Sequence, residues 1–463
     1  MPVDQRRERG LIALAQPGDE VLVVTRGLGH GSARYGGTYI DVQSCGFGSN
    51  EPAITWGVTF GRLGGLLGMS ELPPSPLPHD LETAVRERYG AAAREREEAL
   101  CCPTSYDPTL LAALPSEVIE RDYGCGDPTR HVRAGETVLD LGSGTGKVCL
   151  LAAQVVGPTG RVIGVDMNDD MLAIARRAAP QVAAHIGYAN VEFKKGRFQD
   201  LALDRDLVDA YLAAHPVASE RDLVELEAAI TGLRRDRPLV ADNSIDVVVS
   251  NCVLNLVRPE DKVVMFAELH RVLRRGGRVV ISDIVCDEDV PAALQADPEL
   301  WSGCISGAFR EDRFLEAFEA AGFYGVTVLE RQAEPWRTVE GIEFRSVTVA
   351  AYKGKEGPCL DQKHAVVYRG PWKYVEDDDG HILRRGVRTA VCEKTFGIYG
   401  RAPYREHFDL IEPHVPVPLG EAPPFACGPG TVLRDPRETK GADYRVTTEE
   451  RAPSCDPATG RCC

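Results

Sequence analysis

Three isolated cysteines lie in segments where a thiol could bind a metal ion or act as a reactive group. Cys252, in "IDVVVSNCVLNL", follows an apolar run at residues 245–249, where a buried strand should end and a loop begin. Cys125 lies in "ERDYGCGDP" and Cys304 in "WSGCISGAF". Thiolates are soft ligands for thiophilic ions, although a lone cysteine is more often a small buried hydrophobe. Cys149, inside the apolar run "KVCLLAA", is interpreted as such a buried residue.

The chain has 14 cysteines among 463 residues, and their pattern limits what they can do. A disulfide framework suits small secreted domains, whereas this chain is long and its N-terminal apolar run is too short for a signal-peptide core. No C-x2-C pair of the kind used in zinc sites occurs. We therefore expect reduced thiols, some serving as core residues and others as soft ligands.

The net charge limits the kinds of partner that the protein is expected to bind. A net charge of −16 argues against sequence-independent binding to nucleic acid and against anchoring to an acidic membrane surface. No apolar run approaches the ~18 residues that a membrane helix needs. The sequence therefore predicts a cytoplasmic monomer that acts on a small molecule.

A glycine-rich turn joins a buried strand to a helix in "VLDLGSGTGKVCLLAA", residues 138–153. Glycines at such a turn let the backbone approach a ligand closely, and the spacing is not that of a phosphate loop. The next strand, "RVIGVD", ends at Asp166, where a carboxylate can accept hydrogen bonds from ribose hydroxyls. The pair indicates a nucleotide-containing cofactor.

Strands and helices alternate on both sides of this turn. The strand-like segments "TVLDLG", "RVIGVD", "VEFKKG", "IDVVVSN" and "GRVVISDI" are separated by helical patterns, which predicts an α/β fold with a parallel sheet covered on both faces. Two later strands, "VTVLER" and "FRSVTVAAYKG", should complete the sheet near Gly354. Upstream, a helix is expected from Asp80 to about Leu100 with Asp80 as N-cap, followed by one around "PTLLAALPSEVIERDYG". Downstream, a "DDDGH" turn between alternating residues predicts a hairpin-built β subdomain.

The segment "LDLGSGTG", with Asp140 before the glycines and no third glycine two residues on, resembles the class I S-adenosylmethionine-dependent methyltransferases over roughly residues 105–352. The resemblance implies a Rossmann-like, mostly parallel seven-stranded sheet. The alternative is a redox Rossmann enzyme. In the family, the loop holds the methionine part of the cofactor, the acidic residue after the second strand binds ribose, and the segment after the third strand contacts adenine. The cofactor-binding residues so implied are Tyr123, Asp140, Gly142, Ser143, Gly144, Asp166, Met167, Phe198, Gln199 and Asn251.

In this fold the substrate lies above the carboxyl ends of the strands, under three covering segments. Cys125, Cys252 and Cys304 each lie in one of these segments, and Cys286 near the fifth strand is a further candidate. Three convergent thiolates form a soft trigonal cage suited to As(III). Glycines flank Cys125 and precede Cys304, and we expect them to keep those sulfurs accessible and mobile.

The segments "DYGCG", "SNCVLNL" and "SGCISGA" closely resemble those of the arsenite methyltransferases. The resemblance implies that these three cysteines bind trivalent arsenic beside S-adenosylmethionine. It also implies a fourth cysteine in the catalytic cycle, for which Cys101 and Cys102 both qualify. The C-terminal segments "RETKGADYR" and "SCDPATGRCC" resemble those of bacterial members that carry a C-terminal extension.

The chemistry that follows needs no general base. Arsenic bound to three sulfurs keeps a lone pair directed away from them, and this pair can attack the sulfonium methyl carbon in line. No proton is removed, so the protein has to position the reactants and exclude water. A thiol reductant, thioredoxin or glutathione by resemblance, would restore the cysteines for turnover.

Two other functions compete with an arsenite methyltransferase. One is a methyltransferase for an organic small molecule with structural cysteines, which would call for a catalytic acid or base that we do not identify. The other is a non-catalytic metalloid-binding protein, which the intact glycine loop and Asp166 disfavour. Whether Cys455, Cys462 and Cys463 capture metalloid stays open. The expected organisation is a glycine-rich extension of unknown role at 1–80, the methyltransferase domain at 81–354, a β-rich subdomain at 355–445 and a cysteine-containing flexible tail at 446–463.

Overall fold

The chain divides into two compact units, residues 1–74 and 75–463. The computed structural model describes residues 78–100 and 104–448, together with four strands of the first unit. There β1 (Leu11–Leu14) pairs antiparallel with β2 (Leu22–Thr25), and β3 (Gly31–Tyr35) with β4 (Thr38–Val42).

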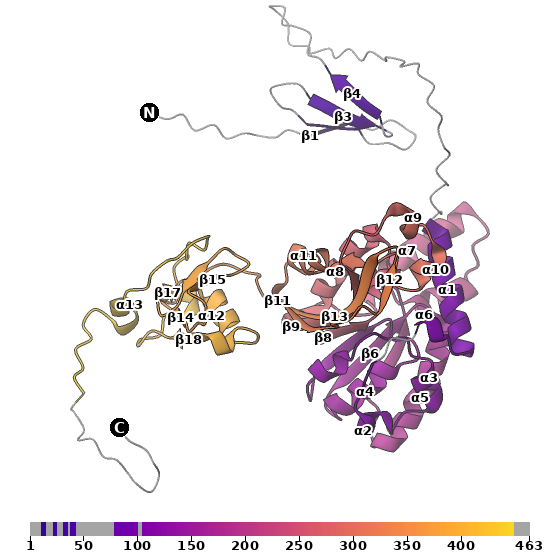
Figure 1. Ribbon diagram of the computed structural model, residues 1–463, viewed down its shortest axis with the longest axis horizontal. Helices are drawn as coiled ribbons and strands as arrows, with labels where there is room; N and C mark the ends of the chain where they lie inside the picture. The colour runs from indigo at the N-terminus through magenta and orange to yellow at the C-terminus, as the bar shows by residue number, and fades with distance from the viewer. Residues whose placement is uncertain are drawn as a thin grey trace, which may run out of the picture. The chain divides into compact units, whose positions relative to one another are not determined.

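The larger unit is built on a sheet with the strand order β11-β13-β9-β8-β5-β6-β7 (Figure 1). Its strands are β5 (Thr137–Leu141), β6 (Arg161–Asp166), β7 (Val191–Lys195), β8 (Ile245–Asn251), β9 (Leu273–Cys286), β11 (Tyr324–Arg331) and β13 (Ile342–Tyr352). Strands β5 to β9 are parallel, and β13 runs antiparallel to both of its neighbours. The short β10 (Phe309–Arg310) and β12 (Arg337–Val339) pair with β9 and β13. The predicted α/β fold with a mostly parallel seven-stranded sheet is confirmed.

Alternate residues of the strands build two separate cores, because successive side chains of a strand point to opposite faces. Val138 packs in a cluster with α4 (Lys147–Val156) and α5 (Asp169–Ile186). Leu139 packs in a second cluster with α8 (Pro259–Val272) and α11 (Glu311–Ala320). Figure 1 shows these two pairs of helices on opposite sides of the sheet. Burial on both faces explains the nearly continuous apolar character of the parallel strands.

The helices that precede the first strand of the sheet differ in detail from the predictions. Helix α1 spans Pro78–Arg94 and is followed by a 3-10 turn, η1 (Glu98–Leu100), so the prediction of Asp80 as N-cap was wrong. Proline is well accommodated in the first turn of a helix, which lets the helix begin earlier. The single helix expected near residue 115 is two short ones, because Pro115 disfavours helical geometry in the residue before it. The remaining elements up to β13 are α2 (Pro108–Leu111), α3 (Ser116–Glu120), η2 (Pro128–His131), α6 (Arg205–Ala214), α7 (Glu220–Asp236), η3 (Leu254–Leu256), α9 (Ala292–Gln295) and α10 (Pro298–Ser302).

Residues beyond β13 form small antiparallel sheets. One has the order β17-β14-β18, and the other is the hairpin β15-β16. The hairpin reverses at the predicted "DDDGH" turn, where Asp377 accepts a hydrogen bond from the backbone N–H of His381 at 2.8 Å. The prediction of a hairpin-built β region is therefore confirmed. The elements are β14 (Ala365–Tyr368), β15 (Tyr374–Glu376), β16 (Ile382–Arg384), β17 (Arg388–Ala390), α12 (Glu393–Tyr399), η4 (Arg405–His407), β18 (Phe408–Ile411), η5 (Leu419–Glu421) and α13 (Pro436–Lys440).

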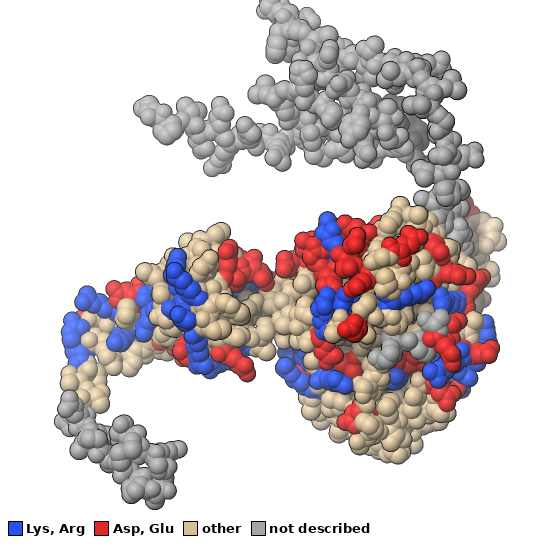
Figure 2. All heavy atoms as spheres, in the orientation of Figure 1, with Lys and Arg blue, Asp and Glu red and all other residues tan. Residues whose placement is uncertain are grey.

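Acidic and basic side chains are interspersed on the face shown in Figure 2. Many of them form surface ion pairs, such as Arg161 with Glu192 at 2.7 Å and Arg234 with Asp200 at 2.7 Å. Over the described parts of the chain, no helix is both long and apolar enough to span a membrane.

The division of the chain at Ser75 leads to a first prediction. A chain that starts at Ser75 should fold cooperatively and retain methyl transfer to arsenite, the activity that the sequence resemblance implies, because all elements of the seven-stranded domain lie after that point. Thermal unfolding and mass spectrometry of reaction products test this. A shortened chain that folds but does not methylate would show that the first unit takes part in catalysis.

Candidate active site

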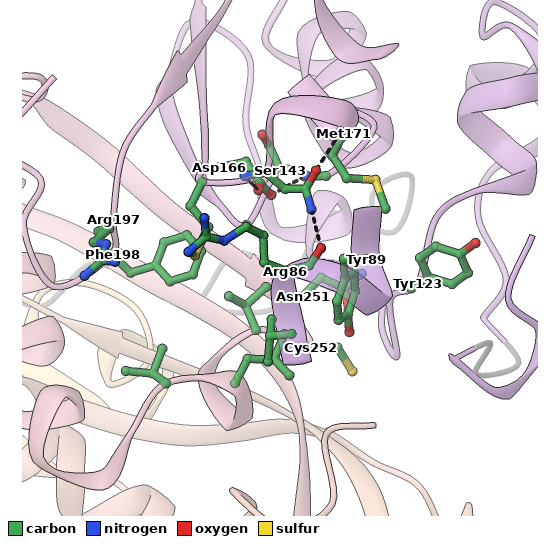
Figure 3. Close-up of a pocket in the computed structure, with 18 of the residues that line it drawn as sticks. Arg86, Tyr89, Tyr123, Ser143, Asp166, Met171, Arg197, Phe198, Asn251 and Cys252 are labelled. Carbon is green, nitrogen blue, oxygen red and sulfur yellow. Dashed lines mark hydrogen bonds between the residues drawn. The ribbon is translucent and has the colours of Figure 1, made fainter. Parts of the chain in front are cut away.

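A cavity opens at the carboxyl ends of β5, β6 and β8, and its space, including the open mouth, is about 1180 Å³. Figure 3 shows Ser143, Asp166, Phe198, Asn251 and Cys252 around it. This is the position where open α/β sheets bind their ligands. All ten residues that the sequence assigned to the cofactor line this one cavity: Tyr123, Asp140, Gly142, Ser143, Gly144, Asp166, Met167, Phe198, Gln199 and Asn251.

The glycine loop needs its glycines for two different reasons. Gly142 has φ +71°, and a Cβ there would collide with the side chain of Val253, so the loop passes very close to the residue after Cys252. Gly144 has φ +51°, and a Cβ there would meet no atom within 4 Å. Gly142 thus permits close packing against the cysteine loop, whereas Gly144 adopts a left-handed conformation in open space.

Asp166, at the end of β6, links the glycine loop to the next turn. Its Oδ2 accepts a hydrogen bond from the backbone N–H of Gly144 at 2.9 Å, and its Oδ1 accepts one from that of Asn168 at 2.8 Å. Burial raises the pKa of this carboxyl, and these backbone donors oppose the rise. The carboxylate therefore holds the loop in place as well as facing the cavity.

Asp140 and Ser143 supply polar atoms with few protein partners at the methionine end of the predicted site. Asp140 is 1% exposed, and burial raises the pKa of its carboxyl to about 8. Cys149 is fully buried as expected, but its Sγ lies 3.1 Å from Asp140 Oδ2 and donates to it, so its assignment as a purely apolar residue was incomplete. The hydroxyl of Ser143 is buried and has no hydrogen-bond partner among the described residues. A carboxyl, an unpartnered hydroxyl and an open glycine loop fit the amino-acid end of S-adenosylmethionine.

The cavity is also lined by Phe198 and Gln199, the predicted adenine-side residues. Gln199 Nε2 donates to Asp261 at 3.4 Å, and Arg258 forms an ion pair with the same carboxylate at 2.7 Å. Helix α1 covers this cavity with side chains that the sequence analysis did not assign, among them Arg86. The sequence predicted a helix ahead of the first strand. It did not indicate which face of that helix lines the cavity.

Cys252 lies directly after β8 with φ +60°, a left-handed conformation that is uncommon for residues other than glycine. It forms a disulfide with Cys125, and their Cα atoms are 5.8 Å apart. The expectation of reduced thiols is thus wrong for this pair. The fold brings two segments 127 residues apart within bonding range, which the spacing in the sequence does not reveal.

Cys304 joins this pair from the third covering segment. It also has a left-handed backbone, with φ +61°, and its Sγ donates to the carbonyl of Cys252 at 3.5 Å. The hydroxyl of Tyr89 lies 3.8 Å from the same sulfur. Cys125, Cys252 and Cys304 share one apolar cluster and are each only 5–6% exposed. The structure therefore brings the three predicted cysteines together.

We expected the neighbouring glycines to keep the sulfur atoms accessible and mobile. The structure shows a different role for them. A Cβ on Gly124 would collide with the side chain of Asn251, and one on Gly126 would lie 2.5 Å from the hydroxyl of Ser282. These glycines instead let the Cys125 segment pack tightly against the ends of β8 and β9. Cys125 is consequently buried rather than mobile.

Two asparagines of "SNCVLNL" hold the other two cysteine segments. Asn251 Oδ1 accepts hydrogen bonds from the backbone N–H groups of Cys125 at 2.8 Å and Gly126 at 3.0 Å. Asn255 is fully buried, and its Nδ2 donates to the carbonyls of Ile284 at 2.6 Å and Cys304 at 3.1 Å. Asn251 was assigned only to the cofactor, and Asn255 was not assigned at all.

Asp283, also missed in the sequence, organises the loop after Cys252. This 1% exposed carboxylate accepts hydrogen bonds from the backbone N–H groups of Val253 at 3.0 Å, Leu254 at 2.7 Å and Ile284 at 2.8 Å. Burial raises its pKa to about 6, against the effect of these donors. An acidic residue ending the apolar run "RVVISD" was the signal that could have identified it.

The other candidate cysteines either make a different contact or lie outside the described ranges. Cys286 is buried in the same apolar cluster, but its Sγ donates to the carbonyl of Phe309 in β10 at 3.2 Å. Cys101 and Cys102 lie outside the described residues, as do the cysteines of the tail.

Comparison with known proteins agrees with this geometry. A methyltransferase domain family matches residues 133–235 and 234–322, and a domain of unknown function (DUF8838) matches residues 355–444. The arsenite methyltransferase of Aquipseudomonas alcaligenes is 30% identical over 350 residues, which covers 72% of this chain and 91% of the relative. The human arsenite methyltransferase is 27% identical over 408 residues, covering 83% of this chain and 96% of that protein.

A solved structure of an arsenic(III) S-adenosylmethionine methyltransferase from Chlamydomonas reinhardtii is 27% identical, with a TM-score of 0.46, and covers 68% of this chain and 99% of its own. Similarity to curated arsenite methyltransferases extends over most of the chain, and the methyltransferase family model matches the domain that forms the cavity. The chain therefore belongs to the S-adenosylmethionine-dependent arsenite methyltransferases.

Proposed function

We propose that Cys125, Cys252 and Cys304 bind arsenite as a three-sulfur complex, which is the form of the substrate that receives the methyl group. The supporting observation is their convergence from three distant segments into one buried cluster, in which Cys252 also lines the cofactor cavity. Soft thiolates match trivalent arsenic better than the oxygen and nitrogen ligands nearby. Cys101 or Cys102 would act as the fourth cysteine of the cycle.

Substrate binding requires that the disulfide between Cys125 and Cys252 is first opened. A thiol reductant, such as thioredoxin or glutathione, attacks one sulfur, and a second thiol releases the mixed disulfide. Two electrons and two protons convert the disulfide into two thiols, while two reductant thiols become a disulfide. The three thiols then replace the three hydroxyls of As(OH)₃, forming three As–S bonds and releasing three water molecules.

The surrounding residues then position the reactants and exclude water. The apolar side chains around the cysteines, including Ile284 and Ile305, keep the cluster dry. Arsenic bound to three sulfurs keeps its lone pair, so the protein needs no base to create a nucleophile.

The cofactor would be held by the groups already facing the cavity. The glycine loop and Asp140 would hold its amino-acid end, Asp166 its ribose, and Phe198 and Gln199 its adenine. When bound, S-adenosylmethionine supplies an electrophilic methyl group on a positively charged sulfur. The monomeric state, the cytoplasmic location, and the absence of nucleic-acid or membrane partners stay predictions from the sequence.

Serine variants of the three cysteines test the proposed substrate complex. Each single change keeps the size of the side chain but replaces a soft thiolate with a hard, protonated oxygen. We expect arsenite methylation to fall by about two orders of magnitude or more, with unchanged S-adenosylmethionine affinity, and a second substitution to add little. Mass spectrometry of products and calorimetry measure the two effects.

Cys286→Ser is the matched control, because Cys286 is buried in the same cluster and a serine hydroxyl can keep its bond to the Phe309 carbonyl. It should methylate arsenite at nearly the wild-type rate. Near-normal methylation by Cys252→Ser would refute the three-sulfur complex. Omission of the thiol reductant should stop turnover of wild type, and steady turnover without it would refute the reductive step.

The pKa of Asp140 leads to a pH prediction. With a pKa of about 8, this carboxyl is mostly protonated below pH 8 in the free protein. A cationic cofactor favours the ionised form, so S-adenosylmethionine affinity should fall as pH drops below 8, by up to about tenfold per unit. Titration calorimetry between about pH 6.5 and about pH 8.5 measures the slope. Asp140→Asn should bind more weakly at pH 8.5 and lose the slope; an unchanged slope would exclude Asp140 as its source.

The same shift has a consequence for stability. A raised folded-state pKa means that the unfolded chain releases this proton at lower pH than the folded chain does. The contribution of Asp140 to the free energy of unfolding is therefore fully present below about pH 4 and is lost as the pH rises toward 8.

Asn255 is expected to act as a positioning residue for Cys304. Asn255→Ala leaves two buried carbonyls without their donor, which should lower the free energy of unfolding by about 1–3 kcal/mol. It should also raise the KM for arsenite while leaving that for S-adenosylmethionine unchanged. Asn190→Ala is the control, because Asn190 Nδ2 likewise donates to two carbonyls, those of Ala153 at 3.1 Å and Gly157 at 2.9 Å. Equal effects of both variants on the arsenite KM would reduce Asn255 to a structural role.

A further inference from the structure

A second cluster of three cysteines lies in the C-terminal β region. Cys359, Cys392 and Cys427 place their sulfur atoms within 4.8 Å of one another. None of the three was assigned a role from the sequence, because they are far apart in it and follow no ligand spacing. None of the residues 355–444 lines the cofactor cavity. The cluster is therefore separate from the methyl-transfer site.

Backbone hydrogen bonds between neighbouring residues bring the three segments together. The carbonyl of Cys359 accepts from the N–H of Phe425 at 2.9 Å, which joins the first segment to the third. The carbonyl of Leu360 accepts from the N–H of Glu393 at 2.9 Å, which joins the first segment to the second. The convergence of the thiols thus follows from the pairing of the main chain and does not depend on side-chain rotation alone.

The sulfur atom of Cys392 is held in place by its neighbour Thr395. Its Sγ lies 3.2 Å from the hydroxyl of Thr395 and accepts a hydrogen bond from the Thr395 N–H at 3.4 Å. Cys392 is buried, Cys359 is half-buried and Cys427 is exposed. An ion could therefore reach the cluster from the Cys427 side.

The donor set points to a particular kind of ion. Within the described residues, the cluster contains sulfur atoms alone, with no histidine or carboxylate among its members. Structural zinc sites usually use four protein ligands, and three thiolates do not complete that set. Trivalent arsenic bonds to three sulfurs, and its lone pair takes the fourth direction. The family to which the chain belongs acts on this ion.

We propose that Cys359, Cys392 and Cys427 form a second binding site for trivalent arsenic, at which no methyl transfer occurs. Three thiols replace the three hydroxyls of As(OH)₃, so that three As–S bonds form, three As–O bonds break and three water molecules leave. No electron is transferred in this exchange. The site holds arsenic on a part of the chain that lacks the methyl donor.

Arsenic stoichiometry of the full-length, reduced protein tests the proposal. Cys427→Ser is the main variant, because Cys427 is exposed and its replacement disturbs the core least. Native mass spectrometry after incubation with arsenite should show one fewer arsenic per chain than wild type. The initial rate of arsenite methylation should stay unchanged. Cys359→Ser should give the same result, and Cys286→Ser should keep the wild-type count.

Several outcomes would overturn the assignment. An unchanged arsenic count in both Cys427→Ser and Cys359→Ser would exclude the site. Stoichiometric zinc in the purified wild type, absent from Cys427→Ser and not displaced by arsenite, would make it a zinc site instead. Cys304→Ser separates this proposal from the active site, because it should lose a different arsenic and the two losses should add in the double variant. A loss in Cys427→Ser without one in Cys304→Ser would support the second site and refute the proposed active-site complex.

Discussion

The side-chain amides of Asn251, at the end of β8, and Asn255, in η3, are the contacts on which the arrangement of Cys125, Cys252 and Cys304 depends. Asn251 binds the backbone of Cys125, and Asn255 binds the carbonyl of Cys304, while Cys252 lies between them in the same short segment. Hydrogen bonds in a buried setting are directional and costly to lose. The short stretch from Asn251 to Asn255 therefore holds two segments that are distant from it in the sequence.

The same strand end also links the cysteines to the cofactor cavity. Gly142 of the glycine loop packs against Val253, so a larger residue at either position would push the two loops apart. Asp283 holds the backbone N–H groups of Val253 and Leu254 and thereby stabilises the left-handed turn at Cys252. Strained backbone persists only where surrounding contacts determine it, and it is frequent at functional sites.

The two cysteine clusters differ in their surroundings, in keeping with the two roles proposed for them. The cluster of Cys125, Cys252 and Cys304 is buried among apolar side chains beside the cavity, a setting suited to a reaction that must exclude water. The C-terminal cluster includes the exposed Cys427, and its residues lie in loops and at the N-terminus of α12, away from the cofactor cavity. A site that solvent reaches through Cys427 suits reversible binding better than a reaction that must exclude water.

The sequence by itself determined the order of the strands, the glycine loop, Asp166 and the choice of Cys125, Cys252 and Cys304, because each depends on local patterns of apolar residues, glycines and strand ends. It could not determine the disulfide between Cys125 and Cys252 or the close packing that their glycines permit. Nor could it identify the roles of Asn255 and Asp283 or the meeting of Cys359, Cys392 and Cys427. These features join residues that are far apart in the chain, and only the packing of the folded backbone brings their atoms within bonding distance.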